Sequence, residues 1–101
     1  MEYNKLVRDR IPAIIAAQGA HAHTRVLSDA EYRECLEKKL DEEVAEYHES
    51  KSLEELADVL EVLFALTEVG GHSREELFSV CDNKREKRGA FSDRIFLISA
   101  D

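Results

Sequence analysis

The sequence predicts an all-α fold, a helical bundle built around an antiparallel helical hairpin, and three observations lead to this prediction. Proline occurs once and glycine four times in 101 residues, and the helix-favouring residues Ala, Leu, Glu, Lys and Arg are abundant. Three segments open with the same Ser-x-x-Glu motif, at Ser28, Ser52 and Ser73, which is the capping box of a helix start. Only a short turn separates the first two of these segments. The length fits one domain, over residues 1–101.

Each helix is predicted from its start signal and from the residues that follow it. Pro12 suits the first turn of a short helix that ends near Gly19. Gly70-Gly71 and Gly89 are typical of the breaks after later helices. Together with the three capping boxes, these breaks predict helices over 29–49, 53–69 and 74–88.

Two short segments are expected to be extended rather than helical. Residues 94–98, Arg-Ile-Phe-Leu-Ile, are typical of a short strand. Residues 24–27, Thr-Arg-Val-Leu, show no helical pattern and could pair with that strand.

The helix predicted over 53–69 is apolar around most of its circumference. Nine of the eleven residues from Leu56 to Leu66 are Leu, Val, Phe or Ala. Such a pattern predicts a helix that is buried centrally. In so short a chain it suggests a neighbour from a second copy, so we expect a homodimer or a homotetramer.

Charge and cysteine usage narrow the classes of partner. The net charge of −8 disfavours nucleic acid, since phosphate backbones attract basic surfaces. No apolar run approaches the roughly 18 residues of a membrane span, so no membrane partner is expected. Cys35 and Cys81 form no CxxC pair, and a reduced, cytoplasmic setting is the simpler interpretation.

Four carboxylates occupy matched positions on the two helices of the predicted hairpin. Glu43 and Glu46 lie three residues apart on one helix, and Glu55 and Asp58 do so on the other, so each pair shares a helix face. The midpoint of 46 and 55 coincides with the midpoint of 43 and 58, so an antiparallel hairpin places the pairs at equal heights. If both faces point inward, the four carboxylates converge near the closed end of the hairpin.

The alternative interpretation is that these acids are ordinary surface residues. Glutamates on helices are usually solvated, and a capping box with Ser52 would by itself explain Glu55. Asp58 favours the site, because Asp is a poor helix former and here lies within the most apolar helix. A buried acid must be paired or bind a metal. Oxygen-only ligands select a hard ion, so we expect Mg²⁺, with Mn²⁺ as a substitute.

Four stretches of sequence resemble those of a known family. Residues 39–46 (KLDEEVAE) and 54–60 (EELADVL) resemble the E-x-x-E…E-x-x-D signature of the MazG-like nucleotide pyrophosphohydrolase superfamily. Residues 3–12 (YNKLVRDRIP) resemble a small-protein branch labelled phosphoribosyl-ATP pyrophosphohydrolase-like. Residues 87–91 (KRGAF) are similar to the K-R-G-G-F of that branch. The resemblance therefore extends over nearly the whole chain.

The resemblance implies an activity and an architecture. It implies Mg²⁺-dependent hydrolysis of a nucleoside triphosphate, for example a non-canonical one, between the α and β phosphates, giving a monophosphate and pyrophosphate. It also implies an all-α, MazG-like bundle that assembles as a dimer or a larger oligomer. Hydrolysis of phosphoribosyl-ATP in histidine biosynthesis is an alternative, and a non-catalytic helical oligomerisation module is a third.

Phosphoanhydride hydrolysis requires a base for water and cations for phosphate. The base could be Glu42, Glu61 or a free oxygen of a cluster acid such as Glu43. The sequence holds no G-x-x-x-x-G-K-[ST] loop, so lysine and arginine must hold the phosphates. Lys39, one turn before Glu43, is the first candidate, and the others come from the basic ends of the chain, namely Lys5, Arg8, Lys84 and Arg88.

Overall fold

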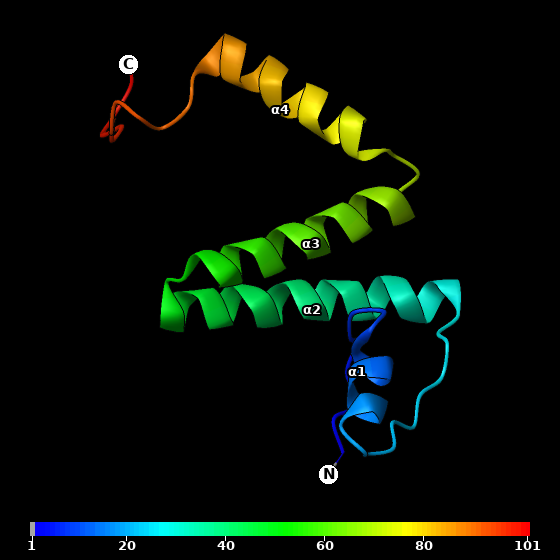
Figure 1. The fold of residues 1–101 in the computed structure, drawn as a ribbon. Coiled ribbons are helices and arrows are strands. Elements are labelled where there is room, and N and C mark those ends of the chain that lie inside the picture. Colours follow the sequence, from blue (N-terminus) through cyan, green and yellow to red (C-terminus); the bar gives the residue numbers. More distant parts are fainter. Residues whose placement is uncertain (1) are drawn as a thin grey trace.

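Four helices make up the regular structure of residues 2–101, the part of the chain that the computed structural model describes (Figure 1). They are α1 (Ile11–Ala17), α2 (Asp29–Ser50), α3 (Leu53–Val69) and α4 (Arg74–Arg88). The predicted all-α class is confirmed. The predicted bounds of α3 and α4 agree with the structure, and α2 extends one residue further than predicted.

The helix starts follow the serine motifs, with one informative difference. Ser28 and Ser73 form complete capping boxes, in which each serine accepts a backbone N–H and the glutamate side chain accepts the serine N–H in return. Ser52 accepts the N–H of Glu55 at 3.2 Å, but the Glu55 side chain does not complete the box. The capping role therefore does not account for the Glu55 carboxylate.

Helices α2 and α3 form the antiparallel hairpin that the sequence predicts (Figure 1). Lys51 adopts a left-handed conformation at the C-terminus of α2, and Ser52 begins α3 directly afterwards, so the turn is tight. After α3 the chain turns at Gly71, whose φ of +89° is readily adopted only by glycine. Helix α4 then diverges from the hairpin (Figure 1). The rings of Phe64 and Phe78, which meet edge to face with centroids 5.8 Å apart, join α4 to α3.

The predicted strand pairing is wrong for this chain. Residues 2–101 contain no strand, and both 24–27 and 94–98 lack regular structure. The two segments lie at opposite ends of the molecule (Figure 1), so neither can supply the other's backbone hydrogen bonds. The tail side chains Ile95, Phe96, Leu97 and Ile98 are all exposed.

The single chain is elongated and has a small core. It measures 61 × 32 × 23 Å, and its radius of gyration of 17.9 Å exceeds the roughly 13 Å of a compact domain of this length. The buried apolar side chains among the described residues are Leu36 on α2 and Val62 on α3. The predicted central burial of α3 is therefore not found within one chain.

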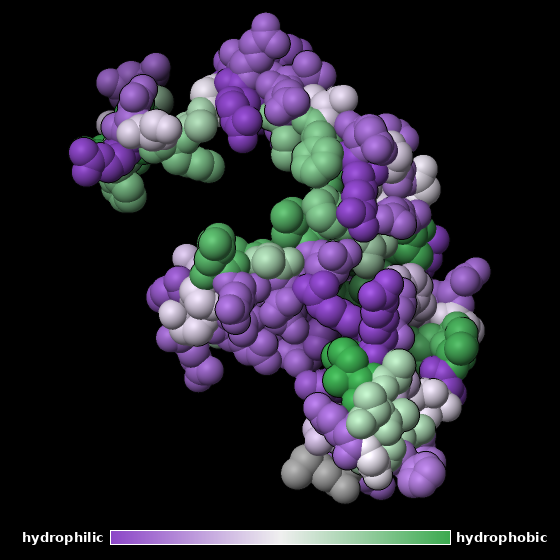
Figure 2. All heavy atoms as spheres, viewed as in Figure 1, coloured by the Kyte–Doolittle hydropathy of each residue, from purple (hydrophilic) through white to green (hydrophobic). Residues whose placement is uncertain are grey.

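One face of α3, here called the leucine face, is open to solvent. Its members follow each other at alternating steps of three and four residues and are all exposed: Leu53, Leu56, Leu60 and Leu63. Figure 2 shows apolar side chains along the side of α3 that points away from α2. This spacing is the seam of a heptad repeat, in which such residues pack against another helix. Among residues 2–101, no helix combines the length and the apolar character that crossing a bilayer requires.

Candidate metal centre

The acids of the hairpin converge into two overlapping groups that share Glu43. Oxygens of Glu43, Glu55 and Asp58, here called the inner triad, lie within 4.8 Å of one another. Oxygens of Glu42, Glu43 and Glu46, the outer triad, satisfy the same limit. The inner triad joins α2 to α3 at the register that the sequence predicted. Glu46 belongs to the outer triad rather than to the inner triad. The four predicted ligands therefore do not all have oxygens within 4.8 Å of one another.

Glu43 is the buried centre of this cluster. It is only 6% exposed, although glutamate is seldom buried without a charged partner. One of its oxygens, Oε2, is inaccessible to solvent and has no hydrogen-bond partner among the described residues, and the same is true of Glu55 Oε2. Burying a carboxylate oxygen without a hydrogen-bond partner lowers the stability of the folded chain. A cation bound by these oxygens would offset that loss.

The electrostatics of the cluster are those of crowded like charges. Burial, followed by the negative charge of Glu46, raises the pKa of Glu55 above its ordinary value. The charge of Glu43 raises the pKa of Glu46 in the same way. Both shifts favour proton uptake by groups that are packed beside other acids. A divalent ion would compete with protons for these groups, so its binding would become weaker as the pH falls into the range in which they take up protons.

Two of the predicted lysines do lie at the cluster. Lys39 Nζ is 3.2 Å from Glu43 Oε1 and 3.4 Å from Glu42 Oε1. Burial alone lowers the pKa of Lys39, but the Glu43 and Glu42 carboxylates outweigh it, so the pKa is raised. Lys5 Nζ approaches Glu42 Oε1 at 3.9 Å from the N-terminal segment. The two lysines flank the outer triad.

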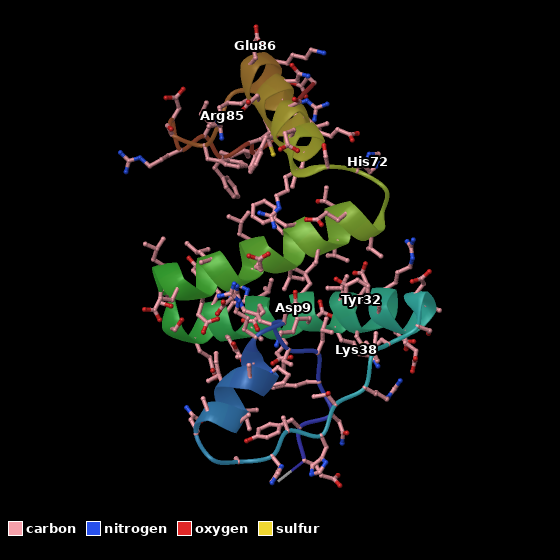
Figure 3. The ribbon with its side chains drawn as sticks, turned by 45° about the vertical axis from the view of Figure 1, so that its right-hand side comes forward. Asp9, Tyr32, Lys38, His72, Arg85 and Glu86 are labelled. Carbon is pink, nitrogen blue, oxygen red and sulfur yellow. The ribbon has the colours of Figure 1, made fainter. Side chains whose placement is uncertain are left out.

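Arg8 binds the α3 side of the cluster. Its Nη2 donates a hydrogen bond of 2.6 Å to Asp58 Oδ1, and its Nη1 lies 3.6 Å from Glu61 Oε1. Figure 3 shows Asp9, the next residue, beside the α2–α3 hairpin, so this part of the chain crosses the cluster. The N-terminal segment and the hairpin, which are 50 residues apart along the chain, thus meet at an acid of the inner triad.

Two predicted cations lie elsewhere in this chain. Lys84 and Arg88 belong to the C-terminal half of α4. Their neighbours Arg85 and Glu86 lie far from the hairpin in Figure 3, because α4 diverges from it. Within one chain, Lys84 and Arg88 are therefore not part of the site. Their position suits the helix dipole, which favours cations at a helix C-terminus.

Arg74 is a neighbour of the site that sequence reasoning did not single out. Its Nη2 lies 3.6 Å from Glu61 Oε2, and its guanidinium stacks 4.3 Å from the Phe64 ring centroid. Glu61 is thereby held between two arginines, Arg8 and Arg74. Arg74 follows the capping serine of α4, and no local pattern indicates that it reaches back to α3.

The residues present suit a hard divalent ion. The converging donors are carboxylate oxygens from two helices, with neither His nor Cys among them. The inner triad supplies three carboxylates, and Glu46 lies beside it as a fourth, influencing the pKa of Glu55. Glu43 and Glu55 also contribute inaccessible oxygens that have no hydrogen-bond partner within residues 2–101.

The fold and the site together define an all-α protein whose helical hairpin carries an acidic cluster with a buried glutamate, Glu43, at its centre. No protein-family model matches the chain, and no solved structure matches it. A relative in Mycolicibacterium smegmatis (strain ATCC 700084 / mc(2)155), described as an uncharacterized protein, is 60% identical over 42 residues. The match covers 42% of this chain and 43% of the relative, so the chain spans less than half of that protein's length.

Proposed function

We propose that this chain is a divalent-metal-dependent nucleotide pyrophosphohydrolase related to the MazG-like superfamily. The observation that carries the proposal is the inner triad, in which Glu43, Glu55 and Asp58 bring their oxygens within 4.8 Å from two helices. The shortfall in the Ser52 capping box adds support, because the Glu55 side chain is used in the cluster instead. The motif resemblance supplies the reaction class, which the geometry of the acids alone does not specify.

The proposed roles follow the positions of the side chains. The inner triad, together with Glu46, would hold Mg²⁺ or Mn²⁺, which neutralises phosphate charge and makes a bound water more acidic. Lys39 and Lys5 lie on one side of the acids and Arg8 on the other, where positive groups can hold phosphate oxygens. A triphosphate bound across the cluster would therefore contact both helices and the N-terminal segment.

The candidate bases are not equivalent. Each carboxylate oxygen of Glu61 lies 3.6 Å from an arginine nitrogen, of Arg8 on one side and of Arg74 on the other, so Glu61 is held in two ion pairs. Glu43 retains an oxygen without a partner, and Glu42 lies in the outer triad beside Lys39. We therefore favour Glu42 or Glu43 over Glu61 as the group that accepts the proton of the attacking water.

Two alternatives have distinct consequences. Hydrolysis of phosphoribosyl-ATP would break the same kind of phosphoanhydride bond with the same acids. Comparing the rates on phosphoribosyl-ATP and on nucleoside triphosphates would therefore separate the two activities. A non-catalytic oligomerisation module would need the leucine face but not a buried acid. The 6% exposure of Glu43 favours the enzyme over this last alternative.

We also propose that the protein works as a homo-oligomer. The leucine face lies on α3, the helix that supplies Glu55 and Asp58, and no other part of residues 2–101 covers it. A second copy of the same face would bury these leucines by heptad packing. Dimers and tetramers would both satisfy this requirement.

A nucleotide panel tests the proposed reaction. Canonical and modified nucleoside triphosphates and phosphoribosyl-ATP are incubated with protein and Mg²⁺, and pyrophosphate and orthophosphate are assayed separately. We expect pyrophosphate and a monophosphate from at least one substrate. Stepwise release of orthophosphate would contradict the cleavage position.

Matched variants test the site itself. Glu55→Gln and Asp58→Asn should each lower kcat/KM by about a hundredfold or more, because each removes a carboxylate of the inner triad. Glu54→Gln changes the exposed neighbour of Glu55 on the same helix and should retain activity. Equal activities for Glu54→Gln and Glu55→Gln would reject the assigned role.

A further inference from the structure

Arg8 contacts the carboxylate cluster more closely than any other cation of the described residues. The 2.6 Å hydrogen bond to Asp58 is the shortest ion pair in this part of the chain, and Glu61 lies 3.6 Å away on the same helix. Asp58 is also a member of the inner triad. The guanidinium of Arg8 therefore occupies an oxygen of a proposed metal ligand.

The N-terminal segment contacts the hairpin through several charged groups. Lys5 reaches Glu42 on α2, and Arg8 reaches Asp58 and Glu61 on α3. Helix α1, which follows the segment, has no close backbone approach to the other helices of residues 2–101. Lys5 and Arg8 thus contact the acids from two sides of the cluster. We call residues 4–8 the clasp, because ion pairs with the acids hold this segment against the hairpin.

We propose that Arg8 and a divalent cation compete for Asp58, so that metal binding releases the clasp from α3. The inference rests on the proposed function, since it takes the inner triad as the metal-binding group. Its physical basis is charge. A divalent ion held by Glu43, Glu55 and Asp58 repels a guanidinium that lies against the same carboxylate, and it also supplies the positive charge that Asp58 otherwise takes from Arg8.

The competing arrangement is that Arg8 stays on one oxygen of Asp58 and orients the other toward the metal. Partners of this kind strengthen metal binding, and removing them weakens it. The two arrangements therefore predict opposite signs for the effect of removing Arg8. Asp58 and Arg8 side chains are 38% and 54% exposed, so the ion pair is partly screened and its displacement is energetically accessible.

Metal affinity provides the first test. Mn²⁺ is titrated into wild-type protein, Arg8→Met, Arg8→Lys and Arg10→Met, and free Mn²⁺ is followed by electron paramagnetic resonance. Arg8→Met, which keeps an unbranched side chain without charge, should bind Mn²⁺ roughly fivefold more tightly than wild type. Arg8→Lys keeps the charge and should remain close to wild type. Arg10→Met removes a positive charge two residues away that forms no ion pair within residues 2–101, and it should have little effect.

Limited proteolysis provides the second test and detects the movement itself. Trypsin cleavage after Lys5 and Arg8 should become faster when Mg²⁺ is added, whereas cleavage after Arg25, in the loop that leads to α2, should change little. Arg25 is a suitable internal reference because it pairs with Glu31, away from the cluster. The accelerated cleavage should be lost in Glu43→Gln, which weakens metal binding.

The outcomes separate this inference from the proposed function. Weaker or unchanged Mn²⁺ binding by Arg8→Met, or slower cleavage after Lys5 with Mg²⁺, would overturn the competition while leaving the metal site intact. Wild-type protein that binds no Mn²⁺ would overturn both. Tighter binding together with faster cleavage would establish the competition even if the preferred nucleotide were still unidentified.

Discussion

The Glu43 carboxylate is the residue on which the candidate site depends most. It belongs to both triads, it is buried, and one of its oxygens has no hydrogen-bond partner in the described part of the chain. Lys39 is the cation that pairs with its other oxygen, at 3.2 Å. One lysine cannot neutralise the adjacent acids: the charge of Glu43 raises the pKa of Glu46, and burial followed by the charge of Glu46 raises the pKa of Glu55.

Replacing Glu43 should remove the stabilisation by Mg²⁺ without lowering the thermal stability of the metal-free protein. Glu43→Gln removes one crowded charge, so without metal its melting temperature should equal or exceed that of wild type. Millimolar Mg²⁺ should raise the wild-type melting temperature by roughly 5 °C, because the ion binds only the folded cluster, and should not raise that of Glu43→Gln. Circular dichroism melts with EDTA and with Mg²⁺ measure both effects.

Asp41→Asn is the matched control for this substitution. Asp41 is exposed on the same helix and lies in neither triad. Its variant should show the wild-type response to Mg²⁺. A Mg²⁺ response that survives in Glu43→Gln would contradict the central role of the Glu43 carboxylate.

At the scale of elements, the start of α2 is stabilised by a local network around Glu31. Its carboxylate accepts hydrogen bonds from Arg25 and from the backbone and hydroxyl of Ser28. These bonds, with that of Arg25 first, lower the pKa of Glu31 from 4.5 to about 2. The ionised form is therefore favoured more in the folded chain than in the unfolded one.

This shift makes the stability of the helix start depend on pH. Because the folded pKa is depressed, Glu31 contributes fully above its ordinary value of 4.5, and its contribution is lost as the pH falls toward about 2. Glu31→Gln should therefore melt below wild type near pH 6, and the difference should shrink as the pH is lowered to about 3. Thermal melts across this range measure it.

Glu34→Gln controls for the loss of one negative charge from the same helix. Glu34 is exposed, lies outside the Ser28 capping box and pairs with Lys38 on the surface. A wild-type advantage over Glu31→Gln that stayed constant from pH 6 to pH 3 would contradict the role given to the Arg25–Glu31 pair.

At the scale of the whole molecule, many large apolar side chains of residues 2–101 are exposed in the single chain. The leucine face, Phe78 on α4 and the tail residues 95–98 are all open to solvent. The 61 Å length reflects a chain in which α4 and the tail extend away from the hairpin. Burying these residues against another copy would supply the core that one chain lacks.

A charge in the leucine face tests the proposed oligomer. Leu60→Glu should convert a dimer or larger assembly into monomers, since it places a carboxylate where two helices would pack. Light scattering after size-exclusion chromatography measures the mass directly. Val26→Glu adds the same charge at an exposed loop position and should leave the assembly unchanged. A wild-type protein that is monomeric at high concentration would contradict the proposal.

The sequence by itself determined the long helices and the convergence of three of the four predicted acids, while Glu46, the fourth, lies in the outer triad. Capping serines, glycine breaks and helix-favouring composition are local signals, and they placed α3 and α4 at the observed bounds. The three-residue spacing of the acids, with a short turn between the helices, was sufficient to predict that Glu43, Glu55 and Asp58 meet. This could be predicted because a tight antiparallel hairpin has little freedom of register.

Only the tertiary structure decided which groups from elsewhere reach that cluster. Arg8, from the N-terminal segment, and Arg74, from the start of α4, both form ion pairs with Glu61 on α3. Lys84 and Arg88 lie away from the cluster because α4 diverges. The strand predicted over 94–98 failed for the same reason, since a strand needs a partner and the path of the chain supplies none. Contacts between distant segments depend on turn angles at residues such as Gly71, which short-range sequence patterns do not encode.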